Sequence, residues 1–282
     1  MKSSVLYLEI VRYIHYIIFS DYYIRRATKR QMDFTRNRKM SFTDYIFAII
    51  KGTKTSLQSS IYTFFESQKR NQMEYSKQAF SKGRQRIKPE AFQELFLAVA
   101  EQFYQKAETN SWRGYHLFGI DGTRLNLPCT QELKEIYGDQ SSQGAPQVQA
   151  LVSCLYDIKN KLEIENFTGY SPDAILQDFY ATVFLANLAG VLAFELHEEI
   201  EAAHNKPENK YEYKMNRNRT ISELKRTVIE MIATRSKIKR MRLFLEMKNR
   251  LYKAVVPVRP NRASPRVRKH KASKFSQNIK RP

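Results

Sequence analysis

Asp121 is the residue of this chain whose type and position point most directly to chemistry. It follows the apolar residues Leu117, Phe118 and Ile120, and the turn-forming Gly122 comes directly after it. Enzymes built on sheets often present a metal-binding carboxylate in this way, at the end of a buried strand. An ordinary Asp-Gly turn between two strands is the alternative, because Asp-Gly is a common hairpin sequence.

Metal chemistry at Asp121 needs further carboxylates close to it in space. Cleavage of a phosphodiester at two divalent ions roughly 3.5–4 Å apart requires several oxygen ligands to converge on the pair. The candidate partners are Asp139, Asp157, Glu163 and Glu165. Glu163 and Glu165 are two residues apart, so a helix would point them to different faces. The simpler interpretation of all four is a solvated surface carboxylate.

Three antiparallel strands are predicted to position Asp121. Apolar and polar side chains alternate along residues 124–127, which indicates a strand that returns as a hairpin after Gly122. The predicted strands are residues 114–121, 124–129 and 147–156. A three-stranded sheet with an uncovered edge would favour pairing with another chain.

Four stretches of the chain, in this order, resemble the DDE transposases of insertion sequences, in the group called the insertion-sequence four family. Residues 76–92 resemble the helical region before the catalytic core of that family. Ile120-Asp121-Gly122-Thr123 resembles the strand of its first catalytic aspartate. Residues 159–180 resemble the end of the core, and residues 256–262 resemble the basic C-terminal segment.

The resemblance implies a ribonuclease H-like core that cuts and joins DNA with Mg²⁺ or Mn²⁺. It makes Asp121 the first catalytic and metal-binding carboxylate and Lys159 a possible signature lysine that contacts a phosphate. The implied partners are the terminal inverted repeats of the element, and the chain itself or an intact transposase. The implied location is the bacterial cytoplasm, at the nucleoid.

The two other catalytic carboxylates of the family are missing from the sequence. The Asp-Arg-Gly-Tyr motif that carries the second aspartate does not occur. If Lys159 is the signature lysine, the family's glutamate, arginine and tyrosine belong where Val152, Val148 and Ala145 stand. We therefore predict an internally deleted transposase, joined near residues 155–157, that does not cut DNA.

The positive charge is concentrated at the C-terminal end. The chain has a net charge of +20, and residues 206–282 contain 24 Lys and Arg against 5 Asp and Glu, a net charge of +19. Such a segment attracts a polyanion, with DNA as the expected one. The alternative is a solvated charged face with a solubilising tail. Membrane-surface binding is disfavoured because the arm at residues 256–282 lacks the tryptophan and leucine face that such segments use.

The candidate DNA contacts lie in two basic stretches. One is a predicted basic loop, residues 81–86, with its flanks, and the other is the C-terminal segment. A helical packing domain with a basic loop is the alternative for the first stretch. The candidate phosphate ligands are Lys77, Lys82, Arg84, Arg86, Lys88, Arg259 and Arg262.

We predict a mixed α+β chain in three parts. Residues 1–112 are expected to be a helical DNA-binding region, with Gly52 breaking a helix and another helix at 89–104. Residues 113–205 are expected to be the remnant of the core. Residues 206–282 are expected to be helical from 219 to 255, with an extended or disordered arm from about 257.

An apolar stretch, residues 179–194, lies within the predicted core remnant. It is predicted to be a buried helix rather than a membrane span, because it is shorter than the ~20 residues that a span needs. Ser171 and Pro172 are suited to begin that helix. The two cysteines and five histidines show no metal-ligand spacing. The cysteines are expected to be reduced, buried or incidental thiols of a cytosolic protein.

Two alternatives to a transposase derivative remain open on the sequence. A basic, non-enzymatic DNA-binding protein without any tie to transposition would bind every duplex alike. A transposase derivative would select the inverted repeats of an element and interfere with an intact copy. A decayed product would have no function.

Overall fold

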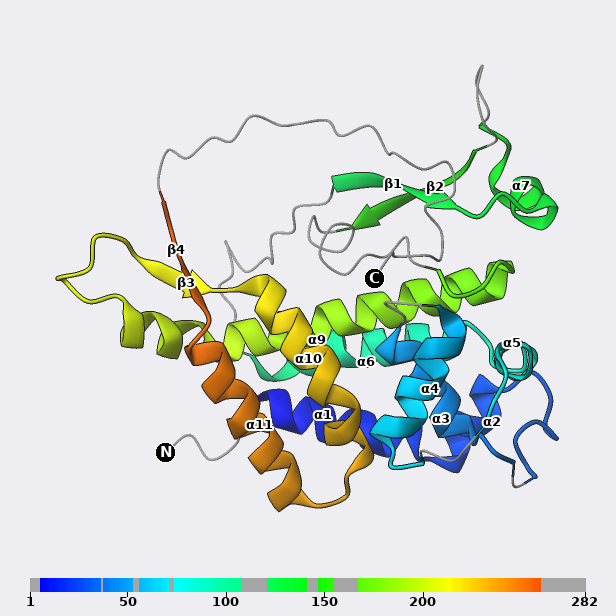
Figure 1. Ribbon diagram of the computed structural model, residues 1–282, viewed down its shortest axis with the longest axis horizontal. Coiled ribbons are helices and arrows are strands. Elements are labelled where there is room, and N and C mark those ends of the chain that lie inside the picture. Colours follow the sequence, from blue (N-terminus) through cyan, green and yellow to red (C-terminus); the bar gives the residue numbers. More distant parts are fainter. Residues whose placement is uncertain are drawn as a thin grey trace. The chain divides into compact units, whose positions relative to one another are not determined.

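The computed structural model describes residues 6–36, 38–52, 56–70, 74–107, 121–140, 147–154 and 167–259, without the side chains of 121–123 and 153–154. Helices predominate in it, and two small antiparallel sheets complete it, so the predicted mixture of α and β structure is confirmed (Figure 1). The described residues form two compact units. Unit 1 comprises residues 6–16, 98–107 and 185–259, and unit 2 comprises 17–97, 121–140, 147–154 and 167–184. The predicted three-part division stays a prediction.

Serine side chains begin four helices of unit 2. The hydroxyl of Ser20, Ser41, Ser56 or Ser76 accepts a hydrogen bond from the third backbone N–H of its helix, which satisfies a donor that the helix leaves unpaired. Gly52 ends one of these helices with φ of 65°, so the predicted break is confirmed. The four helices are α2 (Asp21–Ala27), α3 (Phe42–Lys51), α4 (Leu57–Ser67) and α5 (Lys77–Arg84).

Aromatic side chains hold these helices together. The ring of Tyr45 lies 5.3 Å from Phe80 and 5.5 Å from Phe34, and its hydroxyl lies 2.6 Å from that of Tyr75. Gly83 passes so close to Tyr45 that an added Cβ would lie 1.8 Å from the tyrosine hydroxyl. Helix α5 therefore approaches α3 at a position that only glycine permits.

The sheet that contains Asp121 differs from the predicted hairpin. Strand β1 (Asp121–Leu127) pairs antiparallel with β2 (Val148–Cys154) in one continuous register, from Asp121 opposite Cys154 to Leu127 opposite Val148. The predicted turn at Gly122 is therefore wrong, because Gly122 lies within the strand, opposite Ser153. The predicted third strand is confirmed as β2, and it pairs directly with the segment that follows Asp121.

Other parts of the predicted core remnant lie outside the described residues. This applies to residues 114–120 of the first predicted strand and to residues 155–166. Two strands form the sheet in the part of the chain that is described. Helix α7 (Gln131–Tyr137), capped by Thr130 and packed on β2, follows β1 and was not predicted.

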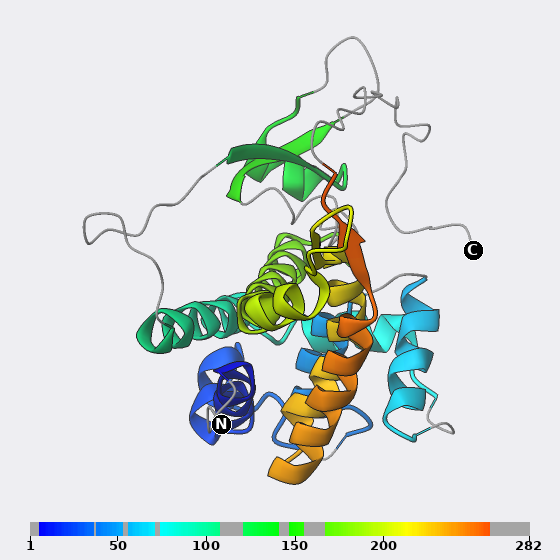
Figure 2. The same ribbon diagram turned by 90° about the vertical axis from the view of Figure 1, so that its left-hand side faces the viewer.

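The C-terminal segment folds as a pair of helices with a small strand pair. Helices α10 (Arg217–Ala233) and α11 (Lys237–Tyr252) lie side by side (Figure 2), and β3 (Tyr213–Met215) pairs with β4 (Val255–Pro257). The predicted helical character of residues 219–255 is confirmed, but the segment forms two helices instead of one continuous helix. Ser236 begins α11 as its N-cap, and buried Arg240 donates from Nε to the Met231 carbonyl at 2.9 Å, which ties α11 to the end of α10.

Three long helices contribute to both units: α1 (Leu6–Ile18), α6 (Glu90–Lys106) and α9 (Pro172–His204). The predicted helix at 89–104 is confirmed as α6. Helix α9 begins as predicted, with Ala174 N–H donating to Ser171 Oγ at 3.4 Å. Among the described helices, α9 alone is long and apolar enough to cross a membrane, which is weak evidence because a core helix passes the same test. One side of α9 is buried at four-residue intervals: Leu188, Leu192, Leu196 and Ile200.

Candidate nucleic-acid interface

The predicted basic loop at residues 81–86 is helical over its first four residues. Helix α5 continues through Arg84, because Phe80 and Gly83 pack against Tyr45. Lys77 and Lys82 lie on the exposed side of this helix. The prediction of a loop is therefore wrong for residues 81–84, and the helix separates its cations into an exposed and a buried set.

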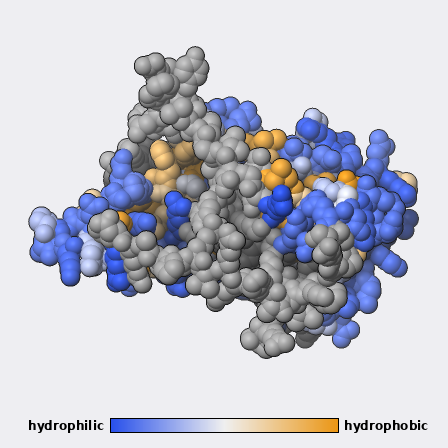
Figure 3. Space-filling view, turned by 90° about the horizontal axis from the view of Figure 1, so that it is seen from above, coloured by the Kyte–Doolittle hydropathy of each residue, from blue (hydrophilic) through white to orange (hydrophobic). Residues whose placement is uncertain are grey.

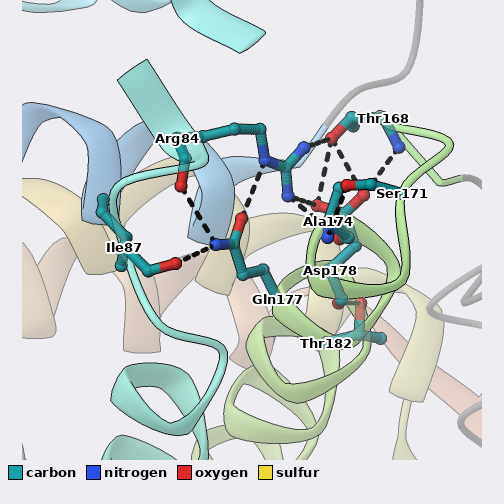
Figure 4. Close-up of polar contacts among 8 residues, drawn as sticks. All are labelled: Arg84, Ile87, Thr168, Ser171, Ala174, Gln177, Asp178 and Thr182. Carbon is teal, nitrogen blue, oxygen red and sulfur yellow. Dashed lines mark hydrogen bonds and ion pairs between the residues drawn. The ribbon is translucent and has the colours of Figure 1, made fainter. Parts of the chain in front are cut away.

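Arg84 belongs to the buried set, with 2% of its surface exposed. Its guanidinium donates from Nε to Gln177 Oε1 at 2.8 Å, and from Nη2 to the Ala174 carbonyl at 3.0 Å and to Asp178 Oδ1 at 2.8 Å (Figure 4). It also donates from Nη1 to the hydroxyl of Thr168. A guanidinium with these partners is not available to a phosphate in this structure.

The Asp178 carboxylate and the Gln177 amide, which accept hydrogen bonds from Arg84, form further hydrogen bonds. Asp178 Oδ2 accepts from the Thr168 backbone N–H at 2.6 Å, and Gln177 Nε2 donates to the carbonyls of Ile87 at 2.7 Å and Arg84 at 3.2 Å (Figure 4). Buried polar groups are stable only when satisfied in this way. The network joins two of the stretches that carry the family resemblance, 76–92 and 159–180.

The other predicted phosphate ligands of the N-terminal half stay candidates. Lys77 and Lys82 are exposed, and Lys88 is half-buried. The Nε of Arg86 lies 3.9 Å from a carboxylate oxygen of Asp33, a distance at which a surface ion pair is weak. The structure brings together no cluster of cations from this set among the described residues.

The predicted catalytic residues can be placed only in part. Asp121 is the first residue of β1, and its side chain is not described. Asp139 forms an ion pair with Lys134 at 2.8 Å. Among the residues that the structure describes, no group of three or more His, Cys, Asp and Glu side chains fits a metal ion. Outside the described residues lie Asp157, Lys159, Glu163 and Glu165.

The densest positive charge that the structure describes lies in residues 206–259. This segment contains 16 Lys and Arg and 5 Glu, a net charge of +11. Helices α10 and α11 bury apolar side chains toward the core, so most of their cations remain on the surface. Hydrophilic residues also dominate the described surface seen in Figure 3. The buried apolar residues at the centre of these two helices include Leu224, Val228, Ile232, Leu243, Met247 and Leu251.

Three arginines of this segment converge on a single carboxylate. Glu223 of α10 is buried, and its Oε1 forms an ion pair with Arg219 Nη2 at 2.9 Å. Its Oε2 accepts from Arg226 Nη2 at 2.5 Å and Nε at 3.1 Å, and from Arg250 Nε of α11 at 2.8 Å. We call Arg219, Glu223, Arg226 and Arg250 the arginine cluster. Its net charge is +2.

The electrostatics of the arginine cluster keep its carboxylate ionised. Burial raises the pKa of Glu223, whereas the hydrogen bonds and positive charges of Arg250 and Arg226 lower it, and the resulting pKa lies below the usual value. The Arg219 and Arg226 side chains are 48% and 55% exposed, and that of Arg250 is 30% exposed. The cluster therefore has a buried anionic centre and a solvent-accessible cationic rim.

A second cationic feature lies beside the strand pair. The Arg259 guanidinium lies 5.8 Å from the centre of the Tyr211 ring, and the Lys210 ammonium lies 5.6 Å from it. Arg259, a predicted ligand, is thus held at the surface by an aromatic ring. Arg262 lies outside the described residues.

The arginine cluster was not predicted, although part of its signal is local. Arg219 and Arg226 stand four residues before and three residues after Glu223, which are the helical spacings for ion pairs. Arg250 follows 27 residues later, so its contribution depends on the pairing of α10 with α11.

Comparisons of the chain with protein-family models, curated proteins and solved structures found no match in any of the three. The resemblance to insertion-sequence transposases therefore rests on the four sequence stretches alone.

Proposed function

We propose that this protein binds DNA through the basic surface of its C-terminal segment, and that it is an internally deleted insertion-sequence DDE transposase that does not cut DNA. The observation that carries the DNA-binding part is the net charge of +11 on residues 206–259, held on a folded pair of helices. Cations at fixed positions release counterions from a phosphate backbone when they bind it.

The chemistry of the reaction supports the loss of cleavage. Two divalent ions roughly 3.5–4 Å apart need several converging carboxylates, whereas the family's second aspartate and its glutamate are missing from the sequence. In the proposal, Asp121 begins β1 in a remnant of a ribonuclease H-like sheet and binds Mg²⁺ or Mn²⁺ at most weakly.

The proposed partner is the terminal inverted repeat of the element, in the bacterial cytoplasm at the nucleoid. A chain that occupies these repeats without cutting them would compete with an intact transposase. It could also form mixed oligomers with that enzyme, since the regions outside the deleted core remain present.

The test uses the purified full chain, its Asp121→Ala variant, Mg²⁺ or Mn²⁺, and two labelled duplexes. One duplex carries inverted-repeat ends taken from the flanking DNA, and the other has an unrelated sequence of equal length. We expect a gel shift that favours the inverted repeats, without cleavage, in both proteins. Cleavage that Asp121→Ala abolishes would contradict the proposed loss of activity, and equal shifts of both duplexes would indicate a DNA-binding protein without a tie to transposition.

A further inference from the structure

We propose that the arginine cluster is a built phosphate-binding site for the DNA backbone, in which Glu223 positions the arginines that contact the phosphate. This inference rests on the proposed DNA binding and assigns it to particular residues. It follows from the excess of three guanidiniums over one buried carboxylate.

The charges of the arginine cluster are unbalanced. A structural ion pair at this position needs one arginine, and Arg250, whose side chain is 30% exposed, provides it from the neighbouring helix. Arg219 and Arg226 add two like charges close to it. Such charges repel one another, and an anion that enters from solvent offsets the repulsion. A phosphodiester group carries the charge that the cluster lacks.

Guanidinium N–H donors of the arginine cluster remain for a ligand. Glu223 receives hydrogen bonds from one nitrogen of Arg250 and two of Arg226, and it forms an ion pair with one nitrogen of Arg219. Within the described part of the chain, the structure shows no other hydrogen bond or ion pair for these three guanidiniums. Since a guanidinium has five N–H donors in a planar fork, each arginine can bind Glu223 and a phosphate oxygen together.

Glu223 preorganises the arginine side chains for binding. A long arginine side chain loses much of its rotamer freedom when it binds a ligand, and this loss weakens binding. Glu223 removes part of that freedom beforehand, because its buried carboxylate already holds all three side chains. The carboxylate therefore positions the arginines, while their exposed edges contact the DNA.

The first experiment removes the exposed arginines and leaves the pair between Arg250 and Glu223 intact. Binding of a DNA duplex is measured by fluorescence anisotropy from 50 to 200 mM salt for the wild type, Arg219→Gln and Arg226→Gln. Each substitution is expected to reduce the affinity roughly tenfold near 0.1 M salt, and to lower the slope of log affinity against log salt by about 0.9. Thermal unfolding should stay near that of the wild type.

Arg242→Gln is the matched control. Arg242 lies on α11, is 68% exposed and stands 3.9 Å from a single carboxylate, that of Glu246. The Arg242→Gln variant loses the same charge from the same helix pair. We expect it to change the affinity for DNA and the salt slope less than Arg219→Gln or Arg226→Gln does. Equal losses in all three variants would overturn a built site and leave only general electrostatic attraction.

Glu223→Gln separates positioning from net charge. This variant makes the protein more positive, so attraction by charge alone predicts tighter binding to DNA. We expect weaker binding, because the three arginines lose the anion that holds them. Thermal unfolding identifies a variant that fails to fold, in which case the arginine variants still decide the proposal.

The outcomes also distinguish this site from the proposed function. A wild-type chain that does not bind DNA at 50 mM salt would contradict the proposed function itself. Wild-type binding that neither arginine substitution changes would overturn the phosphate site alone. Vesicles of phosphatidylserine and phosphatidylcholine are the third probe, and a loss of vesicle binding in the arginine variants, with unchanged DNA binding, would overturn the assignment to DNA.

Discussion

Individual polar groups in the core differ in whether they find a partner. The hydroxyl of Tyr23 donates to the Ala91 carbonyl at 2.8 Å. The hydroxyl of Tyr7 is equally buried, and it has no hydrogen-bond partner among the described residues, although its ring stacks on Phe244 at 5.8 Å. Burial raises the pKa of both tyrosines, so both hydroxyls stay protonated. The same residue type therefore stabilises one site and weakens another.

We expect the substitutions Tyr7→Phe and Tyr23→Phe to have opposite effects on the free energy of unfolding. Tyr7→Phe removes an unsatisfied buried hydroxyl and should stabilise the protein by about 1 kcal/mol, whereas Tyr23→Phe leaves the Ala91 carbonyl unpaired and should destabilise it by about 1 kcal/mol. Urea unfolding of the two variants and the wild type measures both changes. Destabilisation by Tyr7→Phe would show that its hydroxyl has a partner after all.

At the scale of elements, the Arg84 network links α5 to the first turns of α9. Arg84 and Asp178 are 94 residues apart in the sequence, and both side chains are almost completely buried. Removing one partner of such a pair leaves an uncompensated charge in a medium of low dielectric constant. This link, rather than contact with DNA, is the role that the structure assigns to Arg84.

Asp178→Asn is expected to destabilise the protein by about 3–5 kcal/mol, because it leaves the Arg84 guanidinium buried without a counter-charge. Arg86→Gln is the control, since Arg86 belongs to the same basic stretch but forms only a long, half-exposed ion pair with Asp33. That control should change stability by less than about 1 kcal/mol. Thermal unfolding compares the two, and equal effects would contradict the distinction between a buried and a surface pair.

For the whole molecule, the dominant physical feature is the separation of charge along the chain. Residues 206–282 hold a net charge of +19 out of +20, and the other residues are close to neutral. The described part of this segment folds against apolar side chains of its own helices. The positive potential is therefore attached to a folded surface and is not confined to a terminal tail.

We expect the affinity of the full chain for a DNA duplex to depend steeply on salt. If the chain contacts 6–10 phosphates, an increase from 50 to 200 mM salt lowers the affinity by about 10³–10⁵-fold, because each contact releases condensed counterions. Titrations at several salt concentrations give the slope, with a duplex of fixed length. An affinity that stays constant over this range would exclude the phosphate backbone as the main partner.

Part of the candidate site was predictable and part was not. The basic stretch and the helical spacing of Arg219, Glu223 and Arg226 are visible in the sequence. Which of its cations face solvent is not visible, because residues two apart in a helix, such as Lys82 and Arg84 of α5, lie on different sides of it. Lys82 is consequently exposed and Arg84 buried.

The sequence by itself determined the features that depend on neighbouring residues. The serine caps, the helix break at Gly52, the alternating strand at 124–127 and the concentration of charge all follow from local hydrogen bonding, periodicity and composition. Only the tertiary structure decided the burial of Arg84, the continuation of β1 through Gly122 and the convergence of Arg250 on Glu223. Their physical reason is the same: each depends on a partner that is distant in the chain, and no local pattern specifies that partner.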